Sequence, residues 1–443
     1  NTYVLYSKNW SPPTPVPGDV KGLGDFVNHG DLTIDFAGST LRVKWPATEP
    51  HSWGMFRFSG CTQVRCYVNV KGEAGAMLDV GPIPFTFNEN CRNVAVMGSY
   101  DGCHTAVRIA SGAYPKDGGP TVISNDTRRT IGVKLYLLVK HSRYATNLMW
   151  SGDDARILLD TEDVYRSYFP YGVKTHDVRV RGKNNLGADC LLKSYHGRGL
   201  EDIKLRYSNT DTKPGVNDGS PCIEVDWGDS IAAEFRDLWI DVDVQYKNMQ
   251  GSVLSIVRHD DQVLDTSKGP RNHRLHGLRF GGVIRAPGGT PVAPINFNRG
   301  STHLEEWSAL RLERLRLYAV PPIELDVRGV VDSVTLLRVV TTSPVIFIRS
   351  AANPPVLNQI MTHLHGRRVE VNHVVLSGSY SRVVAHVDGN QTTAARRFKV
   401  AMPSSSAEFR LHYHLEPALG AVATAGTESW SGQQETVRSH VVL

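Results

Sequence analysis

The stretch that decides the fold is Asp189-Cys-Leu-Leu-Lys-Ser-Tyr-His-Gly-Arg-Gly-Leu-Glu-Asp-Ile-Lys-Leu-Arg206. It holds a short apolar strand, a polar turn with two glycines, and a second strand in which apolar and polar residues alternate. The same phrase recurs in Phe85–Asn88 with Val94–Val96, Ala155–Asp160 with Val178–Val180, Cys222–Asp226 with Leu238–Ile240, Ile295–Asn298 with Leu315–Leu317, and Ile323–Val327 with Val334–Leu336. A unit of this size does not bury its apolar face alone, so neighbouring units must stack into a solenoid.

The spacing of the phrases indicates the kind of solenoid. With Val253–Arg258 added, the first strands end at Asp160, Lys193, Asp226 and Arg258, which are 33, 33 and 32 residues apart. The units contain strands and turns without a helical period. The sequence therefore predicts an all-β chain folded as a parallel β-helix with loop insertions.

Three segments are expected along the chain. Residues 1–54 form the N-terminal start with a Pro-rich loop, 55–400 the β-helix, and 401–443 a C-terminal β-rich tail or cap. Because the first residue is Asn, we expect the natural start to lie upstream. Leu310–Leu317 alternates with period two except for one shift at Arg314, which predicts a strand with a bulge or a turn.

Composition limits the classes of function. The net charge is +5 and the pI about 8.8, a balance that mildly favours an anionic partner. The sequence shows no run of basic residues or motif typical of nucleic-acid binding, and no apolar stretch approaches the roughly 18 residues of a membrane span. No metal or cofactor motif is present, so we expect neither.

The six cysteines are too few for a disulfide framework at this length. Cys61 and Cys91 occupy equivalent turns, and Cys190 and Cys222 begin equivalent strands. Stacking at about 4.8 Å allows either a buried ladder of thiols or disulfides. Their redox state, and that of Cys66 and Cys103, stays open from the sequence.

The phrases Phe85–Val96, Asp189–Arg206 and Ile323–Leu336 resemble the right-handed parallel β-helices of the pectin-lyase-like superfamily. That group includes polysaccharide lyases, polygalacturonase-type hydrolases and phage tailspike depolymerases. The resemblance covers about residues 30–400 and is specific for architecture rather than chemistry. It implies a single-stranded, right-handed β-helix in an extracellular protein or on a virion surface, in many such proteins as a homotrimer.

Aligning the phrases places Asp160, Lys193 and Asp226 in one row, which we call the predicted row. Two carboxylates in such a row suit glycoside hydrolysis, in which one protonates the leaving oxygen and the other activates water or attacks carbon. Two coils separate the acids by roughly 9–10 Å, which favours inversion of configuration. Asp229 gives a closer partner for Asp226. The first hypothesis is therefore a polysaccharide-degrading glycoside hydrolase.

The same neighbourhood also suits β-elimination on a uronate. A cation such as Lys193, Arg198 or Arg258 would neutralise the substrate carboxylate, and Tyr195, His196 or Lys193 would serve as the base. Flat apolar rings for sugar stacking are expected nearby. The predicted substrate-binding residues are Arg198, Arg258, Tyr165, Tyr168, Tyr171, Trp227 and Asp260.

Other hypotheses stay open beside these two. The chain is alternatively a non-catalytic glycan-binding adhesin or tailspike, or a fructan-type transglycosylase that passes the sugar to a hydroxyl. Each polar residue of the row also has a purely structural explanation, because polar side chains at strand ends satisfy the backbone groups of turns. The tyrosines have one too, as a packed loop.

Overall fold

The computed structural model consists of strands joined by turns and loops. It describes residues 2–6, 24–44, 54–72, 81–110, 129–149, 151–194, 199–210, 220–226, 234–245, 251–257, 273–285, 295–299, 305–308, 310–318 and, beyond these, the residues of the later strands. These residues contain 35 strands and no helix, so none of them forms a helix long and apolar enough to cross a membrane. The chain divides into two compact units, Asn1–Lys193 with Gly199–Asp218, and Ser194–Arg198 with Gly219–Leu443.

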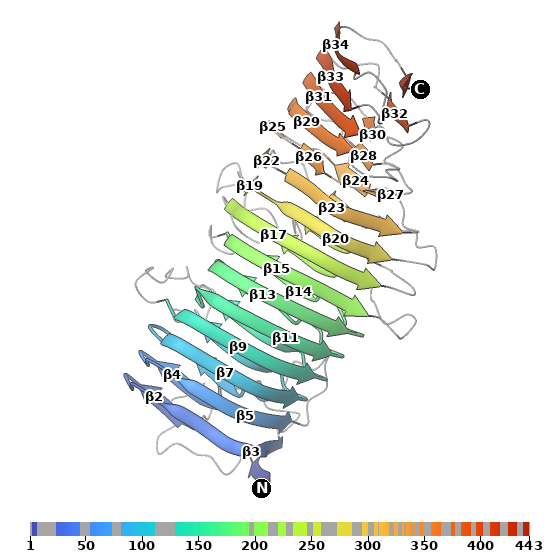
Figure 1. The fold of residues 1–443 in the computed structure, drawn as a ribbon. Coiled ribbons are helices and arrows are strands. Elements are labelled where there is room, and N and C mark those ends of the chain that lie inside the picture. The colour runs from blue at the N-terminus through green and yellow to red at the C-terminus, as the bar shows by residue number, and fades with distance from the viewer. Residues whose placement is uncertain are drawn as a thin grey trace, which may run out of the picture. The chain divides into compact units, whose positions relative to one another are not determined.

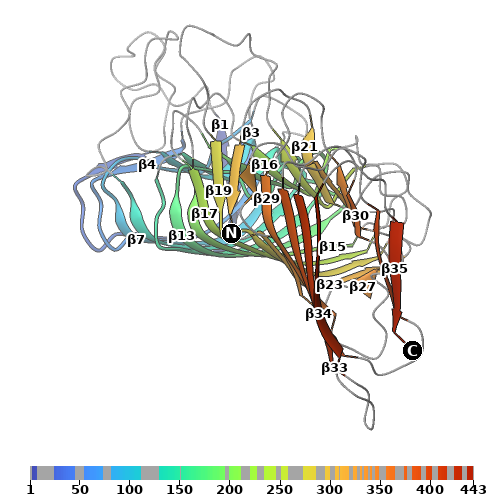
Figure 2. The same ribbon diagram turned by 90° about the horizontal axis from the view of Figure 1, so that it is seen from above.

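The first unit contains two parallel sheets, and successive strands alternate between them (Figure 1). Sheet A holds β1 (Thr2–Tyr6), β3 (Thr33–Lys44), β5 (Arg65–Gly72), β7 (Arg92–Asp101), β9 (Ile131–Lys140), β11 (Ala155–Glu162), β13 (Lys174–Lys183) and β15 (Glu201–Thr210). Sheet B holds β2 (Gly24–Val27), β4 (Phe56–Ser59), β6 (Phe85–Phe87), β8 (Thr105–Ala110), β10 (Tyr144–Met149), β12 (Pro170–Tyr171) and β14 (Cys190–Lys193). In Figure 2 the sheet B strand β4 and the sheet A strand β7 lie in opposite layers.

The second unit repeats this plan. Its sheet A holds β17 (Glu234–Gln245), β19 (His273–His276), β20 (Arg279–Arg285), β22 (Glu305–Ser308), β23 (Leu310–Tyr318), β25 (Val330–Val331), β26 (Val334–Leu337), β27 (Val340–Thr341), β29 (Val356–Leu364), β31 (Arg382–Asn390), β33 (Glu408–Glu416) and β34 (Thr424–Ser431). Its sheet B holds β16 (Ile223–Asp226), β18 (Leu254–Val257), β21 (Ile295–Arg299), β24 (Ile323–Asp326), β28 (Val345–Ile348), β30 (Val374–Leu376), β32 (Arg396–Ala401) and β35 (Val437–Val442).

Pairing is parallel until the last strands. β34 pairs with β33 and β35 pairs with β32 in the antiparallel sense, and each is the final strand of its sheet along the chain. All-β architecture with long parallel sheets, as the repeated phrases predict, is thereby confirmed.

Strand periodicity explains which side chains form the core. In sheet A of the first unit, buried and exposed residues alternate along β5, β9 and β13, so one side of each strand faces inward. Inward-facing residues of successive coils stack on one another. Phe26, Phe58 and Phe87 of sheet B stack with ring centroids 5.1 and 4.7 Å apart. Sheet A therefore keeps a second, outward side for polar residues.

The cysteines belong to this interior. All six are free and buried. Cys61 and Cys91 occupy equivalent turns, as predicted, since the Arg92 N–H donates to the Cys61 carbonyl at 2.8 Å and Thr62 pairs with Arg92. Burial raises the pKa of the Cys91 thiol to about 11, so it stays protonated at neutral pH.

Candidate functional site

The predicted row is wrong in placing Asp160 beside Lys193. Asp160 lies in sheet A, where its register neighbours are Leu138 of β9 and Arg181 of β13. Lys193 ends the sheet B strand β14, and its register neighbour is Tyr171 of β12. The two side chains therefore belong to different sheets of the first unit, and the structure does not bring them together.

Most other residues of the predicted site are not described, and Asp226 is buried. Asp226 ends β16 in the second unit with no exposed surface, and its carbonyl accepts a hydrogen bond from the Ser194 N–H at 2.8 Å. The catalytic roles predicted for it and for Lys193 stay predictions. The predicted residues outside the described part of the chain are Asp229, Tyr195, His196, Arg198, Arg258, Trp227 and Asp260.

The three tyrosines predicted to bind sugar differ in how far they are buried. Tyr168 has no exposed surface and its hydroxyl bonds Nδ1 of His176 at 2.7 Å, so it offers no ring to a sugar, and its predicted binding role is wrong. Tyr165 is half-buried, with the Arg166 guanidinium 4.9 Å from its ring centroid. Tyr171 is also half-buried and packs against Phe169, with ring centroids 4.4 Å apart.

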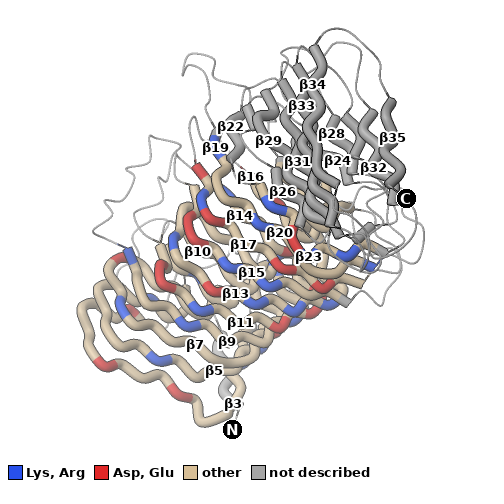
Figure 3. The backbone as a smooth tube through the Cα atoms, turned by 45° about the horizontal axis from the view of Figure 1, so that its top comes forward, with Lys and Arg blue, Asp and Glu red and all other residues tan. Residues whose placement is uncertain are grey.

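Charged, aromatic and apolar side chains lie together on the outward side of sheet A between β9 and β15. We call these outward side chains the basic face. Parallel register arranges them in rows that cross the four strands. The rows are Lys134, Arg156, Asp177 and Lys204; then Tyr136, Leu158, Arg179 and Arg206; then Leu138, Asp160, Arg181 and Ser208. Figure 3 marks the charged positions along these strands.

Four cations of the basic face are exposed and form no ion pair with any residue that the structure describes: Lys134, Arg156, Arg179 and Arg206. They stand in like-charged pairs, because Lys134 is the register neighbour of Arg156 and Arg179 that of Arg206. Neighbouring strands lie about 4.8 Å apart, and like charges directly opposite each other repel. An anion placed between two such side chains would relieve this repulsion.

Two of the acidic residues beside them are neutralised, while Asp177, the register neighbour of Arg156, is exposed. Asp160 forms two hydrogen bonds with the Arg181 guanidinium. Glu162 lies 2.7 Å from Lys140 Nζ and 2.6 Å from Lys183 Nζ. Hydrogen bonds from these two lysines lower the pKa of Glu162 to about 2. The unpaired charge left on the basic face is therefore mainly positive.

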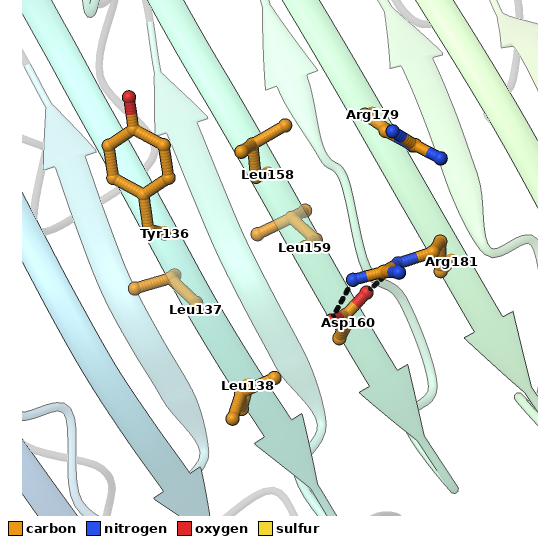
Figure 4. A pocket seen from close by; sticks show the side chains of 8 residues that line it. All are labelled: Tyr136, Leu137, Leu138, Leu158, Leu159, Asp160, Arg179 and Arg181. Carbon is orange, nitrogen blue, oxygen red and sulfur yellow. Dashed lines mark hydrogen bonds and ion pairs between the residues drawn. The ribbon is translucent and has the colours of Figure 1, made fainter.

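A hollow of about 270 Å³ lies on this face (Figure 4). Its exposed lining combines apolar side chains, Tyr136, Leu138 and Leu158, with the Asp160–Arg181 pair and Arg179. Leu138 is 53% exposed and lies next to Tyr136 and Leu158, so the apolar surface here is contiguous. The hollow thus offers apolar surface for the C–H face of a ring beside donors for an anion.

Its chemistry suits binding better than acid catalysis. A glycosidase acid needs a raised pKa so that it carries a proton at neutral pH. Glu162 has the opposite shift, and both carboxylate oxygens of Asp160 accept hydrogen bonds from the Arg181 guanidinium. Within the residues that the structure describes, no group of three or more His, Cys, Asp or Glu side chains is placed to hold a metal ion.

Sequence reasoning named one residue of this face, Asp160, and missed the others. Tyr136, Leu158, Arg179 and Arg206 stand in strands whose alternation was visible, as in Ile131–Lys140. The signal was apolar residues at outward positions, as with Tyr136 and Leu138 between Lys134 and Lys140. It becomes legible only when the register between strands is known.

A comparison with known proteins found no protein-family model, no curated protein and no solved structure that matches this chain.

Proposed function

We propose that this chain is a single-stranded, right-handed parallel β-helix that binds an acidic polysaccharide on the basic face. Its support is the pair of parallel sheets in each unit, the outward alternation of sheet A, and the charge that this face leaves unpaired. The unpaired cations Lys134, Arg156, Arg179 and Arg206 carry the proposal. A protein that kept them only for solubility would have no reason to place them in like-charged register pairs.

The geometry matches a chain of sugar acids. Arg179 and Arg206 present two planar guanidinium groups to one carboxylate or sulfate, and a guanidinium binds either group through two parallel hydrogen bonds. Tyr136 and Leu158 are register neighbours beside them, so an apolar sugar face would rest next to its own acid group. A flat sheet face with repeating rows also suits a repeating ligand.

Cleavage of the bound glycan is a separate part of the proposal. Hydrolysis by Asp226 with Asp229, and β-elimination with His196 as base, stay predictions, as do the homotrimer and the extracellular or virion location. Incubation with polygalacturonate and alginate tests both reactions. Shortened chains without new ultraviolet absorbance would indicate hydrolysis, and absorbance from an unsaturated uronate would indicate elimination. Unchanged chain length would leave a glycan-binding protein.

The binding experiment uses the double variant Arg179→Gln/Arg206→Gln. We expect its dissociation constant for polygalacturonate or alginate to rise at least tenfold, about 1.4 kcal/mol, because two charge-assisted contacts are lost. Wild-type affinity should fall steeply with salt, since exposed charges are screened within about 10 Å at 0.1 M. Arg65→Gln is the matched control: Arg65 is exposed on β5 of the same sheet and already pairs with Asp31 at 3.1 Å.

Three results would contradict the proposal. The double variant binds like the wild type; neutral dextran binds as well as the acidic glycans; or single-stranded DNA competes equally, which would show a surface for any polyanion. Thermal unfolding of all variants should match the wild type, because exposed substitutions away from the core rarely change stability by more than about 0.5 kcal/mol.

A further inference from the structure

The second unit carries an exposed tryptophan on the outward side of its sheet A. Trp239 is 45% exposed on β17. Asp241 and Asp243 follow at alternate positions and are exposed on the same side, while Ile240 and Val242 between them are buried. Side chains two residues apart on a strand lie about 6.6–6.8 Å apart along it. One indole and two carboxylates therefore stand in line on one face.

The indole is held in place from one side. The Arg279 guanidinium carbon lies 4.1 Å from the Trp239 ring centroid, and Trp239 and Arg279 are register neighbours. Arg279 Nε lies 2.8 Å from a carboxylate oxygen of Glu313, whose side chain is only 9% exposed. The chain from Glu313 through Arg279 to Trp239 orders the ring before any ligand arrives, which lowers the entropy lost on binding.

The neighbouring strand places glycines, and no side chain, beside the first carboxylate. Asp241 is the register neighbour of Gly281, and Gly282 follows next to Val242. A Cβ at Gly281 would lie 2.2 Å from the Glu313 carbonyl oxygen, and one at Gly282 would lie 2.0 Å from the Val242 carbonyl oxygen. Gly282 also has φ of +111°, which disfavours any side chain. The backbone of β20 is therefore packed closely here, and β20 presents no side chain to Asp241 at its register position.

Charge decides what kind of ligand fits. Asp243 pairs with Arg285 at 3.2 Å, and Asp241 forms no ion pair with any residue that the structure describes. Two carboxylates accept hydrogen bonds and repel anions. Hydroxyl groups of an uncharged sugar donate such bonds, and the C–H face of a pyranose ring stacks on an indole.

We propose that Trp239, Asp241 and Asp243 form a second carbohydrate site, which binds a neutral pyranose. The ring stacks on the open part of the indole, and its hydroxyls donate to Asp241 and Asp243. This site is separate from the basic face in residues, charge and ligand. It goes beyond the binding of acidic glycans proposed above and does not depend on it.

The experiment measures binding of a panel of neutral oligosaccharides, cellohexaose, mannohexaose, xylohexaose and isomaltohexaose, to the full chain by calorimetry. We expect at least one to bind the wild type, with a dissociation constant that rises tenfold or more in Trp239→Ala and again in Asp241→Asn. Two substitutions serve as matched controls: Tyr67→Ala, at another exposed aromatic residue that is 37% exposed, and Asp31→Asn, at another exposed acid. Neither should change the constant.

Several outcomes would overturn this inference. They are the absence of binding by all four oligosaccharides, unchanged affinity in both site variants, and equal losses in the control variants. Conversion of an oligomer to monomers by Trp239→Ala, with glycan binding intact, would assign the face to contact between copies and also overturn it. Asp241→Asn keeps the size of the side chain, so a failure of Trp239→Ala to fold would leave the test decisive.

Discussion

The strands β11, β13 and β15 carry polar groups on both of their sides, and the two sides differ in how those groups are satisfied. Outside, Arg179 and Arg206 are exposed and unpaired within the described residues. Inside lies a group that we call the Asp189 cluster: Asp189, Thr161, Ser167, Asn185 and Tyr207, of which Thr161 and Tyr207 belong to β11 and β15.

Inside, almost every polar atom has a partner. Asp189 Oδ1 accepts from the Ser167 N–H at 3.1 Å and from the Ser167 hydroxyl. Asp189 Oδ2 accepts from Asn185 Nδ2 and from the Tyr207 hydroxyl, both at 3.0 Å. Burial raises the pKa of Asp189. Polar groups shut away from water must be bonded, whereas outward ones remain available, so the basic face and not the cluster is the place to look for a ligand.

Asp189→Ala tests this comparison with the largest expected effect. It removes four buried hydrogen bonds, two from Ser167 and one each from Asn185 and Tyr207, and should lower the free energy of unfolding by about 3 kcal/mol. Affinity for polygalacturonate should not change, because the side chain does not reach the basic face. Urea unfolding and calorimetry measure the two quantities. A loss of affinity without a loss of stability would contradict the assignment of stability to the Asp189 cluster and of binding to the basic face.

A second buried polar pair predicts pH dependence. His176 Nε2 lies 2.7 Å from the Gly152 carbonyl, so Nε2–H donates there and Nδ1 accepts from the Tyr168 hydroxyl at 2.7 Å. Burial, with a smaller contribution from Arg129, lowers the pKa of His176 from 6.5 to about 3. The unfolded chain therefore binds a proton between these values that the folded chain does not.

Stability conferred by neutral His176 is complete above pH 6.5 and declines as the pH falls toward 3. Between pH 8 and pH 5 the loss amounts to about 2 kcal/mol. His176→Gln should remove this part of the slope, whatever its cost at pH 8, as chemical unfolding at several pH values would show. Binding to the basic face should persist down to pH 5, since arginine and lysine stay charged. An unchanged slope in the variant would contradict the buried neutral imidazole.

Much of the fold was predictable because strands and turns recur in order. Five of the six phrases pair a sheet B strand with a following sheet A strand, as in β14 with β15 and β24 with β26. The predicted bulge is confirmed: Arg314 lies in β23 with φ of 53°, and the register with β20 shifts between Phe280 and Gly282. The alternation of apolar and polar residues in the sequence is enough to predict these strands.

The phase of the repeat was not predictable in one coil. Ala155–Asp160 and Val178–Val180 are both sheet A strands, with β12 between them in sheet B. That strand has only two residues, Pro170 and Tyr171, which carry no strand signal in the sequence. Skipping it moved Asp160 into the predicted row, although Tyr171 is the residue that stands beside Lys193.

Composition also leaves open which way a side chain points. Tyr165, Tyr168 and Tyr171 are equivalent as letters, yet only Tyr168 is fully buried, because it stands next to the strand pairing of Cys190 and reaches His176. Likewise the cations of β13 and β15 become a site only through register, which brings Arg179 beside Arg206 although 27 residues separate them. Contacts of this kind follow from stacking and not from any local motif.

The smallest effect is expected for a substitution at Glu162, an acidic residue on the outward side of sheet A. Glu162 is the register neighbour of Lys140 and Lys183 and bonds both. Glu162→Gln should cost only about 0.5–1 kcal/mol of stability, because exposed ion pairs contribute little, and less still at high salt. Since the folded pKa is about 2 and the ordinary value is 4.5, the contribution is complete above pH 4.5 and disappears as the pH falls toward 2.

Removing this acid also frees two lysines on the basic face. Affinity for alginate should therefore rise by a factor of about two at low salt, while the Arg179→Gln/Arg206→Gln variant lowers it. Affinity would then rise when an acid of this face is removed and fall when its arginines are removed. This result is expected only if the ligand is an anion that contacts the basic face. A fall in affinity in Glu162→Gln would mean instead that the carboxylate itself binds the sugar, and the basic face would then resemble the Trp239 site in its chemistry.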